Sequence, residues 1–149
     1  MNHTIEIALK KSTTETINWF VSTLSSQGYS VIHKDEISCT LGGPGQTNTR
    51  QNPLLGATEL NIICNKNLLT VKAYLGGVKW LRNFLIIFPI GLTILLALIF
   101  ALTSILNSKV IYILLSTLAP WPIITHLLSN FNKKRTLRSL EVLVRNSQY

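Results

Sequence analysis

The chain has 149 residues, of which 47% are hydrophobic and only 13% charged, and its mean hydropathy is +0.33. This balance is too apolar for an ordinary soluble domain of this size, and it excludes a disordered chain. Fourteen Lys and Arg against six Asp and Glu give a net charge of +8, which favours a polyanion or an anionic membrane surface as partner, and two cysteines exclude a disulfide scaffold.

The first 78 residues carry the patterns of a small folded domain. Apolar residues alternate over residues 5–9, which predicts a strand. Ser12 and Glu15 then form a capping-box pattern, and apolar residues recur at helical spacing until Gly28, which predicts a helix over about residues 13–27. Four further stretches have the strand period, and the first two pair most simply as a hairpin: residues 29–33, 37–41, 60–64 and 69–75.

These elements predict an α+β head over residues 1–78 with the order β-α-β-β-β-β, in which one helix covers one face of an antiparallel sheet. A domain of fewer than about 80 residues has a marginal core. We therefore expect the head to gain stability from docking on the membrane segments or from self-association.

Residues 42–56 read GGPGQTNTRQNPLLG and have the composition of a loop. No Lys-Ser/Thr pair and helix follow the glycines, so the segment does not match a phosphate-binding loop. Loops of this length are often functional. We therefore interpret it as the candidate surface for a protein partner, with these residues: Gly42, Gly43, Pro44, Gly45, Arg50 and Pro53.

Residues 83–108 and 110–132 contain no charged side chain and predict a transmembrane hairpin over residues 79–130, with spans at about 84–106 and 110–129. No cleavable signal peptide is expected, so the first span would direct insertion. Cations flank both spans while Lys109 alone lies between them, which places both termini on the cytoplasmic side, or the matrix or stromal side of an organelle. The residues expected at the membrane interface are Trp80, Arg82, Lys133, Lys134, Arg135 and Arg138.

Three prolines interrupt the predicted spans. Pro89 lies in the first, and Pro120 and Pro122 flank a tryptophan in the second. Each removes a helical hydrogen bond and frees a carbonyl one turn earlier, so we expect kinks at these positions. Freed carbonyls at Ser116 and Leu118 could form an ion or substrate site, but no acidic or basic side chain accompanies them within the spans, which favours a packing kink.

Residues 131–149 predict a basic amphipathic helix that lies along an anionic leaflet. Alternatively, its apolar stripe packs on the sheet face that the first helix leaves open. Binding to nucleic acid is not expected, because the cations lie beside the spans and lack interleaved aromatic residues.

The residues that could carry chemistry do not form a recognisable site. Two cysteines fall on apolar strand faces, and the three histidines are separated in the sequence from one another and from the cysteines. We therefore expect no catalytic residue, metal or cofactor among these candidates: Cys39, Cys64, His3, His33, His126 and Glu59.

The sequence thus predicts a non-enzymatic, two-span membrane protein that acts as an accessory or assembly subunit of a larger membrane complex. One alternative is a homo-oligomeric pore or membrane-perturbing protein, although the first span has no polar stripe to line a water-filled path. A second alternative is a membrane-anchored head that binds a lipid or another small molecule.

Overall fold

The computed structural model describes residues 2–44, 52, 54–103 and 107–149. The chain forms two compact units, Met1–Val78 with Asn132–Tyr149, and Lys79–Phe131. We call the first the head and the second the helical unit. The predicted five-stranded antiparallel sheet with its helix, followed by further helices, is confirmed.

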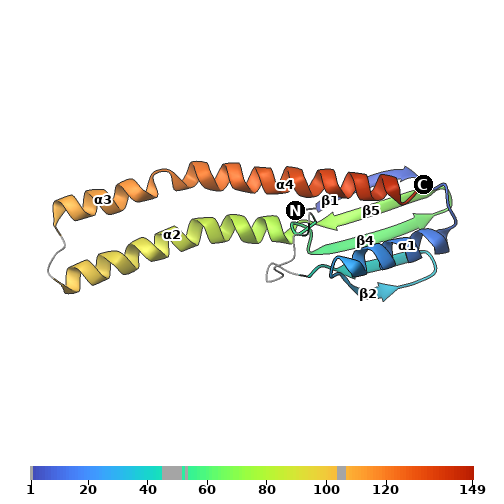
Figure 1. Ribbon diagram of the computed structural model, residues 1–149, viewed down its shortest axis with the longest axis horizontal. Coiled ribbons are helices and arrows are strands. Elements are labelled where there is room, and N and C mark those ends of the chain that lie inside the picture. Colours follow the sequence, from blue (N-terminus) through green and yellow to red (C-terminus); the bar gives the residue numbers. More distant parts are fainter. Residues whose placement is uncertain (1, 45–51, 53, 104–106) are drawn as a thin grey trace. The chain divides into compact units, whose positions relative to one another are not determined.

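The head is built on the sheet, whose spatial order is β1-β5-β4-β3-β2 with every neighbouring pair antiparallel (Figure 1). Because side chains alternate between the two faces of a strand, every second residue of the central strands reaches the same face, and these residues are apolar and buried there. The strands are β1 (Asn2–Ala8), β2 (Ser30–Lys34), β3 (Ser38–Gly42), β4 (Glu59–Asn65) and β5 (Leu68–Tyr74).

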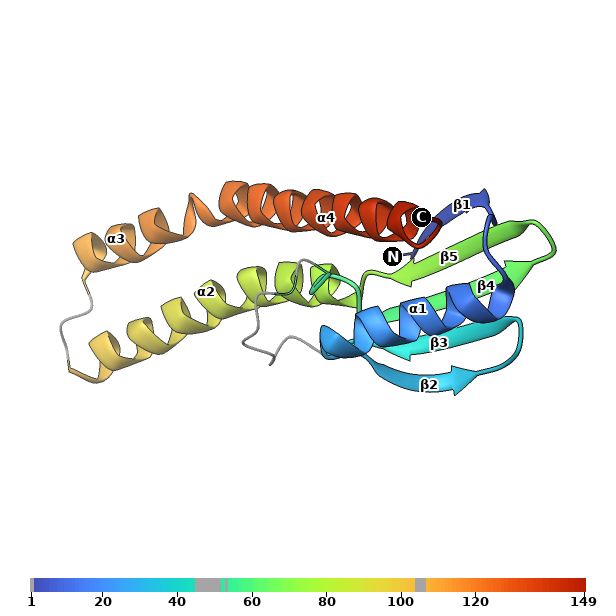
Figure 2. The same cartoon turned by 45° about the vertical axis from the view of Figure 1, so that its right-hand side comes forward.

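Helix α1 (Thr13–Ser26) packs on this core face (Figure 2). Its start is set by the capping box, since the backbone N–H of Glu15 donates to Ser12 Oγ and the backbone N–H of Ser12 donates to the Glu15 carboxylate. After the helix, Gly28 has a φ of 88°, a left-handed conformation that glycine adopts without strain. The buried side chains of α1 include Ile17, Phe20 and Leu24.

The end of the chain completes the same core. Helix α4 (Trp121–Asn146) continues through residues 132–146, where the side chains of Leu140 and Val144 are 0% exposed. Val144 shares a groove with Ile5 and Ile7 of β1, and Val142 shares another with Trp19 of α1. The terminal helix therefore lies beside α1 on the same sheet face.

This corrects two expectations for residues 131–149. They do not form a separate helix with a free apolar stripe, because that stripe is buried in the head. The stripe also does not cover the opposite sheet face. The physical reason is width, because five strands span about 20 Å whereas a helix is about 10 Å across, so α1 alone cannot cover the core face.

The helical unit contains most of α2 (Gly76–Leu102), all of α3 (Ser108–Leu118) and the first half of α4. Gly76–Leu102 and Ser108–Asn146 are long enough and apolar enough to cross a membrane. Ala119 and Pro120 separate α3 from α4, whereas Pro89 lies inside α2.

Candidate functional site

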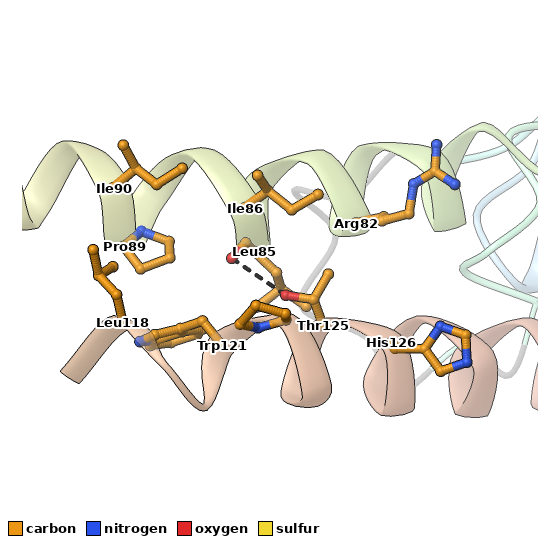
Figure 3. Close-up of a pocket in the computed structure, with 10 residues that line it drawn as sticks. Arg82, Leu85, Ile86, Pro89, Ile90, Leu118, Trp121, Thr125 and His126 are labelled. Carbon is orange, nitrogen blue, oxygen red and sulfur yellow. Dashed lines mark hydrogen bonds between the residues drawn. The ribbon is translucent and has the colours of Figure 1, made fainter. Parts of the chain in front are cut away.

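Pro89 creates the polar contact between the helices of the helical unit. Proline has no N–H, so the carbonyl of Leu85 lacks its usual helical donor. Thr125 of α4 is only 5% exposed, and its hydroxyl donates to this carbonyl at an oxygen–oxygen distance of 3.4 Å (Figure 3). The proline in one helix is thus compensated by a hydroxyl from the other.

A pocket of about 560 Å³ lies beside this hydrogen bond. Arg82 and His126 stand at one end, and the opposite end is apolar (Figure 3). The pocket falls within the size range of small-molecule sites, about 300–1,000 Å³. Its lining residues are Arg82, Leu85, Ile86, Pro89, Ile90, Leu118, Trp121, Pro122, Thr125 and His126.

The basic side chains of the pocket, Arg82 and His126, differ in their partners. The Nε2 atom of His126 lies 2.9 Å from the side-chain amide nitrogen of Asn130, one turn later on α4. Among the described residues, Arg82 has no carboxylate partner. Residues 79–131 contain no Asp or Glu at all.

Only part of the loop predicted as a partner surface can be assessed. Gly42 ends β3, and the backbone N–H of Gly43 donates to the Thr58 carbonyl at 2.8 Å, so the loop leaves the sheet in a fixed direction. Pro44 is half-buried. The other predicted partner residues lie outside the described residues: Gly45, Arg50 and Pro53.

The far end of the loop is held in the head core. The Tyr29 hydroxyl lies 2.8 Å from the carbonyl oxygen of Ala57 and 3.0 Å from that of Leu54, and burial raises the pKa of Tyr29 above its ordinary value. The Asn52 amide also donates to the Gln27 carbonyl at 3.0 Å. This part of the predicted loop therefore has a structural role.

The residues predicted at a membrane interface divide between the two units. In the helical unit, Trp80 is exposed and stacks on Phe84, with ring centroids 5.3 Å apart. The four cations after the second apolar stretch belong to the head, and Arg138 lines a groove beside α1. Lys133 is half-buried, whereas the rest of this group is exposed: Lys134, Arg135 and Arg138.

The two cysteines lie on the core face of the sheet, and burial raises the pKa of both Cys39 and Cys64. Both thiols therefore remain protonated near neutral pH, which makes them weak nucleophiles and weak metal ligands. Within the part of the chain that the structure describes, no three His, Cys, Asp or Glu residues converge as a metal site would require.

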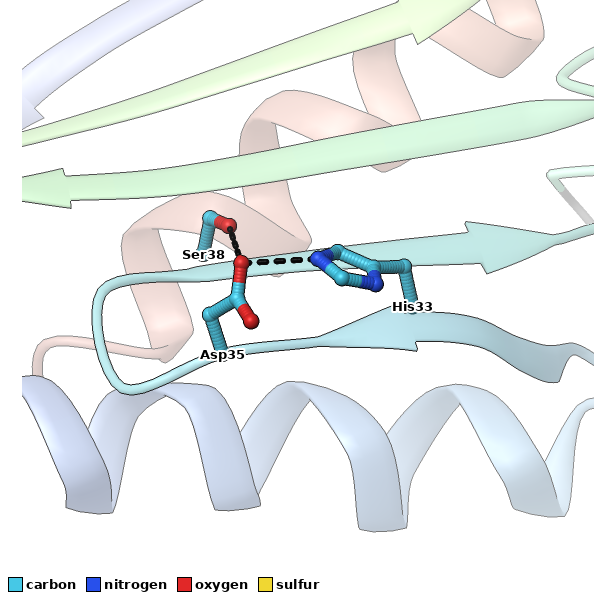
Figure 4. Close-up of polar contacts among 3 residues, drawn as sticks. All are labelled: His33, Asp35 and Ser38. Carbon is cyan, nitrogen blue, oxygen red and sulfur yellow. Dashed lines mark hydrogen bonds and ion pairs between the residues drawn. The ribbon is translucent and has the colours of Figure 1, made fainter.

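A polar cluster at the β2–β3 turn resembles a catalytic triad only in composition. Asp35 Oδ2 lies 2.7 Å from His33 Nε2 and accepts a hydrogen bond from Ser38 Oγ at 3.3 Å (Figure 4). In a triad the histidine stands between the serine and the carboxylate so that it can take the serine proton. Here the carboxylate stands between them, and the cluster braces an exposed turn. His3 and Glu59 lie on β1 and β4, outside this cluster.

Reasoning from the sequence missed the pocket and the Thr125–Leu85 hydrogen bond. The available signal was Pro89, which identifies Leu85 as the carbonyl without a donor; the partner helix and its hydroxyl could not be identified from one helix alone. Of the two carbonyl residues expected one turn before Pro120 and Pro122, which are Ser116 and Leu118, Leu118 lines the pocket. Comparisons of the chain with protein-family models, curated proteins and solved structures found no match.

Proposed function

We propose that this protein is an integral membrane protein with two spans, and that its head acts as a non-enzymatic accessory or assembly subunit of a larger membrane complex. The head would dock on protein partners at the cytoplasmic, matrix or stromal face. The bilayer, with its anionic headgroups, would be the second partner.

The composition of the head core supports an anchor with both ends on one side. Residues 1–78 and 132–149 precede and follow the helical unit, yet they belong to one compact unit. Leu140 and Val144 share a hydrophobic core with Leu60 and Val71. Segments that share a core lie on the same side of any membrane, so the intervening residues would cross it an even number of times.

The charges support the cytoplasmic side as the location of the head. Lys79 and Arg82 precede the exposed apolar part of α2, and four cations follow the second apolar stretch, whereas Lys109 stands alone between the two. Retention of Lys and Arg on the cytoplasmic side favours this orientation.

The single observation that carries the accessory role is a group of three exposed apolar side chains on the β2–β3 hairpin of the head. Val31, Ile32 and Ile37 are 43%, 64% and 62% exposed. We call these three residues the hairpin patch. The hairpin offers a partner apolar side chains on both of its faces, since Ile32 lies against Gly42 and Ile37 lies beside the start of α1.

The form of β2 indicates how a partner would bind there. The pairing of β2 with β3 shifts between Val31 and His33, which leaves Ile32 as a bulge on this outer strand. A bulge disfavours the addition of another strand at a sheet edge. The hairpin patch would therefore contact a partner through side-chain packing.

The test is purification of the tagged full-length protein from its native membrane in a mild detergent, followed by native mass measurement and identification of the co-eluting proteins. The Ile32→Ser/Ile37→Ser variant removes the hairpin patch. The matched control is Leu68→Ser, which changes a side chain of similar character that is 43% exposed at the start of β5.

We expect foreign subunits in fixed stoichiometry with the wild type and the control, and their loss from the hairpin-patch variant. Assemblies of this chain alone would overturn the accessory role and favour the pore alternative. Recovery of the wild type in the soluble fraction after carbonate extraction would overturn membrane insertion itself.

A further inference from the structure

We propose that the pocket of the helical unit binds one anionic phospholipid, with the phosphate beside Arg82 and an acyl chain along the apolar end. This inference rests on the proposed membrane insertion and adds a specific ligand to it. It concerns a site in the helical unit, whereas the proposed protein contacts involve the head.

The pocket has the polarity of a phospholipid. Arg82 and His126 stand at one end, whereas Pro89, Ile90 and Leu118 stand at the other (Figure 3). Ile90 follows Arg82 by eight residues, about 12 Å along α2 at about 1.5 Å per residue. The transition from charged to apolar lining thus follows the direction from a membrane surface to its interior.

Charge complementarity selects the headgroup. Arg82 has no carboxylate partner among the described residues, and Lys79 lies one turn before it. Because residues 79–131 contain three cations and no Asp or Glu, an anion gains attraction without displacing an existing ion pair. A guanidinium binds a phosphate with two parallel hydrogen bonds, and an adjacent choline would be repelled by these cations.

The backbone around the pocket indicates that it is formed before a ligand binds. Thr125 satisfies the Leu85 carbonyl at the pocket wall, so the ligand need not supply a donor there. Trp121 begins α4 directly after the interruption at Ala119 and Pro120, and it lines the pocket. An acyl chain therefore meets a wall in which the Leu85 carbonyl is already paired, and this lowers the cost of its entry.

The test uses the full-length protein in detergent, with phosphatidylglycerol and phosphatidylcholine supplied in equal amounts and the retained lipid identified by native mass spectrometry. We expect one phosphatidylglycerol per chain in preference to phosphatidylcholine. Arg82→Gln is expected to reduce the bound fraction of phosphatidylglycerol about tenfold, since hydrogen bonds to charged groups are among the strongest in proteins.

Two further variants separate the pocket from general surface charge. Lys79→Gln removes an equal charge from the same end of α2, but Lys79 does not line the pocket, so retention should stay within about twofold of wild type. Ile90→Trp fills the apolar end and should reduce phosphatidylglycerol retention while the headgroup contact remains intact.

Equal losses in Arg82→Gln and Lys79→Gln would overturn the site in favour of nonspecific attraction. Displacement of the lipid by inorganic phosphate would also overturn it, because a free anion would then be the better ligand. Equal retention of both lipids would refute the selectivity. Carbonate-resistant insertion into vesicles, measured on the same preparations, distinguishes failure of this site from failure of the proposed membrane insertion.

Discussion

The head and the helical unit differ in the exposure of their leucine and isoleucine side chains. In the head, Leu60 and Ile62 are 0% exposed, whereas in the helical unit Ile87 is 68% exposed and Leu102 is 79% exposed. Burial of leucine and isoleucine stabilises a fold in water, whereas their exposure along a long helix is favourable only in an apolar medium. The contrast is the one that the proposed membrane insertion of the helical unit would produce.

The head is formed from two separate parts of the sequence, and this has a consequence for its stability. The head takes its core from both ends of the sequence, so the residues of the helical unit form an insertion between β5 and the helix that completes the core. Stability of the head should therefore depend on residues far from its sheet in sequence. Three predictions sharpen the contrast, from the largest expected effect to the smallest.

Leu140→Ala should destabilise the head by about 2–5 kcal/mol, because it removes a fully buried side chain and leaves a cavity beneath α4. Amide hydrogen exchange of β4 and β5 in the full-length protein would measure the loss. The control Val142→Ala lies two residues away at a position that is 54% exposed, so its effect should stay within about 0.5 kcal/mol. Equal effects of the two changes would show that α4 does not belong to the head core.

Replacing a glycine with alanine should have different effects on stability in the head and in the helical unit. A Cβ at Gly56 would clash with Thr136 Oγ1 and would lie 3.0 Å from Val78 Cγ2, so Gly56→Ala should cost about 1–3 kcal/mol. A Cβ at Gly91 of α2 meets nothing within 4 Å, and alanine favours helix there.

Thermal unfolding in detergent, followed by amide hydrogen exchange in each unit, should show that Gly56→Ala lowers the stability of the head. The Gly91→Ala variant should lose no stability in the helical unit. A tolerated alanine at Gly56 would contradict the close packing of this loop end against α4.

Tyr29→Phe should lower the unfolding free energy of the head by about 1 kcal/mol at pH 8, because a buried carbonyl loses its donor. Burial raises the pKa of Tyr29, so the folded state keeps its proton at a pH where the unfolded chain ionises. The contribution of Tyr29 is therefore fully present below about pH 10 and decreases as the pH rises further.

The difference between wild type and Tyr29→Phe should narrow above about pH 10, as measured by denaturant unfolding at several pH values. The control is Tyr74→Phe, at a side chain that is 43% exposed. This variant should change neither the unfolding free energy nor its dependence on pH. If the unfolding free energies of wild type and Tyr29→Phe differed by the same amount from about pH 8 to about pH 11, burial would not raise the pKa of Tyr29 in the folded state.

Much of the head could be read from periodicity. The predicted five-stranded antiparallel sheet and the capped α1 follow from alternating apolar residues and from Ser12 with Glu15, all of which act between near neighbours in the chain. The two long apolar stretches follow from composition alone.

The role of the last residues could not be read in this way. Leu137, Leu140 and Val144 form an apolar stripe beside cations, a pattern that fits a membrane surface and a protein core equally well. The width of the sheet decided between them, because the core face over β5 and β1 required a second helix.

The sequence by itself determined the strands and the capped helix of the head, the apolar stretches and the distribution of charge, because these depend on spacing and composition within short segments. Only the tertiary structure decided that residues 132–149 complete the head, that Thr125 meets the carbonyl left without a donor by Pro89, and that Arg82 and His126 share a pocket. Each of these pairs residues that are distant along the chain, and their proximity depends on how whole elements pack. A linear pattern does not encode that packing directly.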